Sequence, residues 1–168
     1  MQNRLKIGIS ACLTGMPVRY DGTSKLQPHI LEFFADKAEL IPVCPETGCG
    51  LGVPRETIQL VGNPKAPRLE TTGTKRDITA VMQAWIETTL TELVVLHDIK
   101  GFIFKARSPS CGYNDTPVWQ ADGRALNGQG LFAQAVSVNL PQIVCADEEM
   151  LTTATKLETF WRKIKARC

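Results

Sequence analysis

Three short apolar segments each lead into a loop that carries a cysteine, and this repeated arrangement constrains the fold more than any other feature of the sequence. The segments span residues 5–9, 40–43 and 101–104, and the cysteines that follow them are Cys12, Cys44 and Cys111. Apolar runs of this length, bounded by Gly, Pro and Ser, are typical of buried strands. Ligands bind beyond the carboxyl ends of parallel strands, so we expect the three sulfurs to meet at one sheet edge if the strands are neighbours.

Helical segments separate the predicted strands. Apolar residues recur at helical spacing over 28–37, 78–97, 131–139 and 148–165, and a fourth strand is predicted over 142–145. This alternation indicates an open, mostly parallel sheet of about four or five strands flanked by helices, a Rossmann-like three-layer α/β fold. The Gly- and Pro-rich stretch 44–75 is predicted to cover the site rather than to build the core. We expect a single domain that spans residues 1–168.

The composition excludes several classes of protein. With 43% hydrophobic and 21% charged residues, the chain has a globular rather than a disordered profile. A net charge of +2 without a basic stripe argues against stable nucleic-acid binding, and the apolar segments are too short or too interrupted to span a membrane. Residues 1–9 lack the apolar segment of a signal peptide, so we expect a cytoplasmic protein, either a monomer or a homodimer.

The six cysteines suit a metal centre better than disulfides, because thiols stay reduced in the cytosol and the chain has no C-x-x-C pair. A single cysteine is more often a small buried hydrophobe, but Cys12, Cys44 and Cys111 share one position relative to their strands. Zinc prefers four ligands or histidine, and both histidines lie outside the cysteine loops, so an iron–sulfur cluster fits better. Three thiolates leave one iron of a cubane cluster open to a soft ligand such as sulfur. Cys49 is close enough in sequence to be a fourth ligand.

Polar residues near these cysteines are candidates for acid–base chemistry and substrate binding. Glu46 lies two residues after one predicted ligand, and Ser108 lies three residues before another. A carboxyl group in such a place moves protons, and a hydroxyl holds a water or a developing charge. The candidates for substrate binding are Asp21, Arg55 and Ser110. Turn capping, solvation and structural ion pairs are the ordinary alternatives for all five residues.

Three sequence blocks together resemble the thiouracil desulfurase family. They are residues 9–13 with 18–22, residues 44–46 with 50–55, and Lys-Ala-Arg-Ser-Pro-Ser-Cys-Gly over residues 105–112, in the family's order over nearly the whole chain. The resemblance implies an oxygen-sensitive 4Fe-4S cluster on Cys12, Cys44 and Cys111, and the removal of sulfur from thiolated pyrimidines without net redox change. It also places the family's acid–base glutamate at Glu46 and its active-site serine at Ser108. The sequence departs from the family at Cys49, where a small residue is usual.

We therefore predict an iron–sulfur desulfurase that converts a small thiolated pyrimidine, either a nucleobase such as thiouracil or a nucleoside, to the oxo compound and hydrosulfide. Two alternatives stay open. One is a non-catalytic metal or sulfur-carrier protein in which Cys49 completes the ligand set. The other is a nucleotide-binding α/β module with incidental cysteines, which is disfavoured because neither G-x-G-x-x-G nor a Walker loop follows the first predicted strand.

Overall fold

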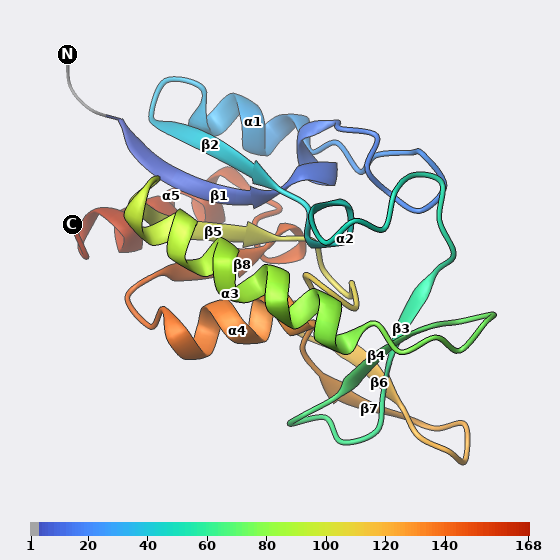
Figure 1. Ribbon diagram of the computed structural model, residues 1–168. Helices are drawn as coiled ribbons and strands as arrows, with labels where there is room; N and C mark the ends of the chain where they lie inside the picture. The colour runs from blue at the N-terminus through green and yellow to red at the C-terminus, as the bar shows by residue number, and fades with distance from the viewer. Residues whose placement is uncertain (1–3) are drawn as a thin grey trace.

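A four-stranded parallel sheet forms the centre of the computed structural model, which describes residues 4–168 (Figure 1). Its strands lie in the order β2-β1-β5-β8 and are all parallel to their neighbours. They span Leu5–Ser10 (β1), Ala38–Val43 (β2), Ile99–Phe104 (β5) and Val144–Asp147 (β8). The predicted open parallel sheet is therefore confirmed, with the three cysteine-bearing strands side by side. Residues 1–3, which form part of the segment used to judge the absence of a signal peptide, lie outside the described residues.

Helices cover both faces of this sheet (Figure 1). On one face lie α1 (Pro28–Phe34) and α5 (Ala154–Lys165), whose apolar residues pack with those of β1. On the other face lie α3 (Thr79–Val95) and α4 (Leu131–Asn139), which pack against the phenylalanines of β5. The predicted three-layer arrangement is confirmed. Within the described part of the chain, no helix combines the length and the apolar character needed to cross a membrane.

The alternation of side chains along β5 explains why this strand contributes residues to the hydrophobic cores on both faces of the sheet. Phe102 and Phe104 point into the core under α3 and α4, whereas Ile103 points to the opposite core. The neighbouring β1 accommodates Phe102 with a glycine: a Cβ atom built at Gly8 would lie 2.3 Å from the phenylalanine ring. Gly8 therefore lets a large aromatic residue fill the centre of the sheet next to the strand that leads to Cys12.

A second, smaller sheet was not predicted. It has the order β4-β3-β6-β7, and its strands are Ile58–Val61 (β3), Arg68–Thr71 (β4), Thr116–Trp119 (β6) and Ala125–Gly128 (β7). Each strand has only four residues, and charged residues, Pro117 and Gly128 interrupt the apolar pattern. The prediction that residues 44–75 only cover the site is wrong, because Leu60 and Leu69 are fully buried in the main core.

The C-terminal elements begin later than predicted. Helix α5 begins at Ala154, where the Thr153 side chain accepts a hydrogen bond from the N–H of Lys156 at 3.3 Å, and not at residue 148. Residues Glu148–Met150 instead form a 3-10 turn (η2), which Asp147 caps. Strand β8 extends two residues beyond its predicted end, so Cys145 lies within the strand rather than at its end.

Candidate active site

The loops that follow β1, β2 and β5 line a cavity of about 250 Å³ at the carboxyl edge of the parallel sheet. Cys12 lies in the 3-10 turn Ala11–Thr14 (η1), and Cys44 precedes the short helix α2 (Pro45–Gly48). Cys111 lies in the loop after β5. All three cysteines line the same cavity. The parallel topology thus brings together three sulfurs that are separated by up to 99 residues in the sequence.

The buried thiols influence one another electrostatically. Burial raises the pKa of Cys12 to about 11; Lys105 opposes this shift and Cys44 adds to it. Burial also raises the pKa of Cys111, a hydrogen bond from Ser10 opposes the shift, and Cys44 and Cys12 increase it. Iron binds cysteine as the thiolate, so ligation of iron by these cysteines would displace protons from the thiols.

The donor set fits a multinuclear cluster better than a single metal ion. Over residues 4–168, no three His, Cys, Asp or Glu side chains converge as the ligands of one ion would. Ligands of one zinc ion must all lie about 2.0–2.3 Å from it, whereas the thiolates of an iron–sulfur cluster bind separate irons. Three cysteines from three different loops line one cavity, and cysteine thiolates are the ligands that an iron–sulfur cluster uses.

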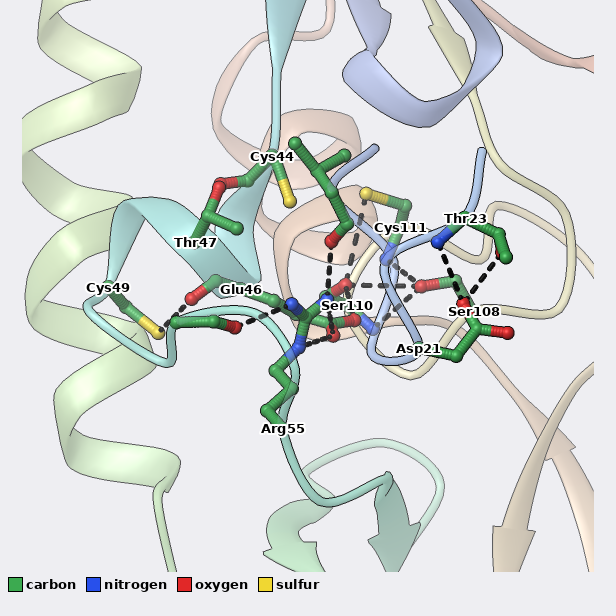
Figure 2. A network of polar contacts seen from close by, with 12 residues as sticks. Asp21, Thr23, Cys44, Glu46, Thr47, Cys49, Arg55, Ser108, Ser110 and Cys111 are labelled. Carbon is green, nitrogen blue, oxygen red and sulfur yellow. Dashed lines mark hydrogen bonds and ion pairs between the residues drawn. The ribbon is translucent and has the colours of Figure 1, made fainter. Parts of the chain in front are cut away.

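A carboxylate with fixed orientation lies beside the cysteines (Figure 2). Glu46, in the first turn of α2, contacts Arg55 through Oε2: Nε of Arg55 donates at 2.9 Å and Nη2 lies 2.7 Å away. Its other oxygen, Oε1, accepts a hydrogen bond of 2.9 Å from the Ser110 hydroxyl. The Arg55 and Glu46 side chains are only 9% and 15% exposed, so this ion pair is shielded from bulk water.

The two serines of the loop after β5 form a chain of hydroxyl groups that ends at Glu46. Ser108 Oγ accepts the N–H groups of Ser110 at 3.3 Å and Cys111 at 3.1 Å, so it does cap the turn. It also lies 3.1 Å from Ser110 Oγ. The single hydroxyl hydrogen of Ser110 is donated to Glu46, so the hydrogen between the serines must come from Ser108. Ser108 therefore donates to Ser110, and Ser110 donates to Glu46.

Comparison with known proteins identifies the family of this chain. The family model described as 2-thiouracil desulfurase matches residues 7–148. The chain belongs to the 2-thiouracil desulfurase family. A solved structure of TudS, a 4Fe-4S-dependent thiouracil desulfidase, is 28% identical, with a TM-score of 0.71 and coverage of 93% of this chain and 99% of that one. The uncharacterized protein YbbK of Bacillus subtilis (strain 168) is 30% identical over 135 residues, or 74% of this chain and 85% of the relative.

These findings confirm the predicted family, the enzyme class and the α/β fold. The matched residues 7–148 include all three cysteine loops and Glu46. They end at Glu148, the first residue of the turn after β8. The region that the family model matches therefore includes all the residues that line the cavity.

Two residues singled out in the sequence do not line the cavity of this desulfurase. Asp21 is exposed, and its Oδ1 accepts hydrogen bonds from the N–H of Thr23 at 3.1 Å and from its hydroxyl at 2.6 Å, so it closes a turn. The thiol of Cys49 donates to the carbonyl oxygen of Glu46 at 3.4 Å and packs against the main core. In Figure 2, Cys49 lies on the opposite side of Glu46 from Cys111. This geometry supports neither a substrate contact for Asp21 nor a ligand role for Cys49.

Sequence reasoning missed a buried ion pair that supports the loop after β5. Lys105 Nζ lies 2.5 Å from Glu148 Oε1, and the N–H of Ala106 donates to Glu148 Oε2 at 2.6 Å. Glu148 is 8% exposed and follows β8, so it connects the edge strand of the sheet to the loop that carries Ser108 and Cys111. No local pattern signals a partner 43 residues away, and the sequence had placed Glu148 in a helix.

A glycine at the start of α4 brings that helix against the serine loop. The N–H of Phe132 donates to the Ser110 carbonyl at 2.9 Å, and the N–H of Gly130 donates to the Gly112 carbonyl at 2.8 Å. A Cβ atom at Gly130 would lie 2.5 Å from the carbonyl carbon of Ser110. The start of helix α4 thus fixes the backbone around Ser110 and Cys111, and only a glycine at position 130 lets the helix come this close to the loop.

Proposed function

We propose that this chain is an iron–sulfur-dependent desulfurase that replaces the sulfur of a thiolated pyrimidine, such as 2-thiouracil, with oxygen from water. The observation that carries the proposal is that Cys12, Cys44, Cys111 and Glu46 line one cavity. Family membership and the similarity to TudS support it. Exchange of C=S for C=O with one water releases hydrosulfide and one proton, and it involves no net oxidation or reduction. We place this reaction in the cytoplasm, where cysteines stay reduced.

Cys12, Cys44 and Cys111 are the residues that would hold a 4Fe-4S cluster. When bound through three thiolates, such a cluster supplies an open iron that acts as a Lewis acid toward the substrate sulfur. The contact between the Cys49 thiol and the Glu46 carbonyl favours three cysteine ligands over four. It therefore favours a catalytic site over the alternative of a carrier protein with a closed cluster.

Glu46 is the residue that we assign to proton transfer. A carboxylate that lines the cavity can take a proton from the attacking water and deliver it to the departing sulfur. Arg55 holds this carboxylate in place, because its remaining donors bind the carbonyl oxygens of Gly52 at 2.9 Å and Val18 at 2.8 Å. We therefore assign Arg55 to positioning Glu46, in place of the direct substrate contact predicted from the sequence.

Ser110 and Ser108 complete the proton path. Ser110 donates to Glu46 Oε1, and Ser108 in turn donates to Ser110. When Glu46 gains a proton, Ser110 Oγ can accept a hydrogen bond from the carboxylic acid and turn its own hydrogen toward Cys111 Sγ, 3.9 Å away, since a hydroxyl both donates and accepts. The serine pair therefore links the carboxylate to the cavity surface near Cys111, where Ser108 orients the water or the substrate.

The test is anaerobic reconstitution with iron and sulfide, followed by an assay with 2-thiouracil. The proposal predicts a brown protein that releases uracil and hydrosulfide in equal amounts. A protein that binds iron and sulfide but releases neither product would instead support a carrier role. A protein that remains colourless and free of iron after reconstitution would contradict the cluster.

A further inference from the structure

Arg19 differs from the other cations that line the cavity. Three of the four are ion-paired: Arg55 with Glu46, Lys105 with Glu148, and Arg107 with Glu149. Arg19 also lines the cavity, but no carboxylate within residues 4–168 pairs with it. Its Nε atom is buried, and the described part of the chain offers it no hydrogen-bond acceptor. A buried donor without an acceptor is costly, which indicates that the guanidinium group has a partner outside the protein.

The backbone around Arg19 is held firmly. The N–H of Arg19 donates to the Thr23 carbonyl at 3.2 Å, and its carbonyl accepts from the N–H of Gly22 at 2.9 Å. Arg55 binds both neighbours, since Nη2 donates to the Val18 carbonyl at 2.8 Å and its backbone N–H donates to the Tyr20 carbonyl at 2.9 Å. The residue that positions Glu46 therefore also positions the segment that carries Arg19. A backbone held in this way reduces the freedom that the segment carrying Arg19 loses when a ligand binds.

We propose that Arg19 binds the carbonyl oxygen of the thiolated pyrimidine and thereby determines which ring carbon faces the cysteines. The proposal rests on the proposed function, because it takes 2-thiouracil as the substrate. This compound carries one carbonyl besides its thiocarbonyl, and that carbonyl oxygen is the atom assigned to Arg19. The planar guanidinium presents several donors to the edge of a planar ring. The other three cations have carboxylate partners, so Arg19 is the cation available to this oxygen. A ring without the oxygen leaves the buried donor unpaired, and such sites discriminate strongly against ligands that lack the acceptor.

Two substrates and two proteins test this proposal. The substrates are 2-thiouracil and pyrimidine-2-thione, which lacks the carbonyl oxygen, and the proteins are the reconstituted wild type and Arg19→Met. We expect the wild type to favour 2-thiouracil by about 10- to 100-fold, both in kcat/KM and in affinity measured by equilibrium dialysis. Arg19→Met should lower the values for 2-thiouracil to those for pyrimidine-2-thione, and leave the latter within about twofold of wild type.

Arg107→Met is the matched control, because it removes the same charge from the same cavity but from an arginine already paired with Glu149. It should keep the wild-type preference. If Arg19→Met does not fold, Arg19→Lys replaces it, since it retains the charge and removes the Nε donor; it should reduce the preference several-fold.

Three results would overturn the proposal: no preference in the wild type, an equal loss for both compounds in the variant, or a lower iron and sulfide content in Arg19→Met. The last result would assign Arg19 to the cluster. If the wild type releases no hydrosulfide at all, the proposed function fails, and the dialysis measurements still decide the role of Arg19.

Discussion

Arg55 contacts a single carboxylate oxygen of Glu46 twice, through Nε at 2.9 Å and through Nη2 at 2.7 Å. This contact leaves the other oxygen to accept the hydrogen bond from Ser110. Both carboxylate oxygens are thus held by the protein, Oε2 by Arg55 and Oε1 by Ser110. A base held in this way keeps its geometry without a substrate, which is what efficient proton transfer requires.

Glu46→Gln is expected to keep the cluster and lose activity. The amide has the same shape but cannot accept a proton from water, so kcat should fall by at least about 100-fold. Iron and sulfide content should equal that of wild type, because Glu46 is not one of the proposed ligands. Glu149→Gln, on an exposed carboxylate, is the control and should retain activity. Wild-type turnover in Glu46→Gln would remove this residue from the mechanism.

Replacement of each proposed ligand is expected to prevent cluster binding. Cys12→Ala, Cys44→Ala and Cys111→Ala each remove one of three thiolates, so the reconstituted proteins should lack visible absorbance, iron and sulfide. Cys49→Ala is the matched control, because its thiol contacts the Glu46 carbonyl outside the cavity lining. Loss of iron in the Cys49 variant would mean that the cluster has four cysteine ligands and would contradict the open iron.

The central sheet and the gathering of the three cysteines were predictable because both follow from local patterns. Apolar strands followed by small-residue loops indicate a parallel sheet, and parallel neighbours must end at the same edge. Glu46 and Ser108 were predicted as site residues because each lies near a cysteine in the sequence, and both line the cavity. Their joint contact with Ser110 could not be predicted, since it depends on how two loops 64 residues apart pack together.

The features that sequence reasoning missed depend on long-range packing. The strands of the small sheet are too short to show alternation, and its two local hairpins are joined by the distant pairing of Leu60 with Val118. Arg19 was passed over because an unpartnered donor is visible only once all neighbours are placed. Asp21, a polar residue before a glycine, was predicted either to bind substrate or to close a turn, and its hydrogen bonds close a turn. The single domain and the oligomeric state stay predictions.

Removal of Glu148 is expected to destabilise the protein strongly. The Lys105 and Glu148 side chains are 17% and 9% exposed, so Glu148→Ala leaves a largely buried ammonium group and the N–H of Ala106 without their acceptors. Breaking such a pair costs about 3–5 kcal/mol in the free energy of unfolding, which urea denaturation measures. Glu149→Ala, which breaks an exposed pair with Arg107, should cost at most about 1 kcal/mol. Equal effects of the two changes would show that the Glu148 pair is not effectively buried.

Gly130→Ala is expected to disturb the serine loop. The added methyl group would lie 2.5 Å from the Ser110 carbonyl carbon and 2.7 Å from the N–H nitrogen of Gly112, and both are backbone atoms that cannot move aside cheaply. Overpacking of this kind costs about 1–3 kcal/mol. The melting temperature should fall, and iron content after reconstitution should fall with it, because Cys111 lies between the two contacted residues. An unchanged melting temperature with full iron loading would show that α4 does not fix this loop.

Cys145 is expected to resist alkylation until the pH is very high. Burial raises its pKa to about 12, and Arg167 opposes this only in part. A raised pKa means that the reactive thiolate is scarce below that pH, so at pH 8 only about one thiol in ten thousand is ionised. Cys168 is exposed and should react first with iodoacetamide in the reconstituted protein. Peptide mass spectrometry after timed quenching gives both rates, and the Cys145 rate should rise about tenfold per pH unit between pH 8 and 10. Modification of Cys145 as fast as Cys168 at pH 8 would show that β8 leaves the sheet edge often enough to expose its thiol.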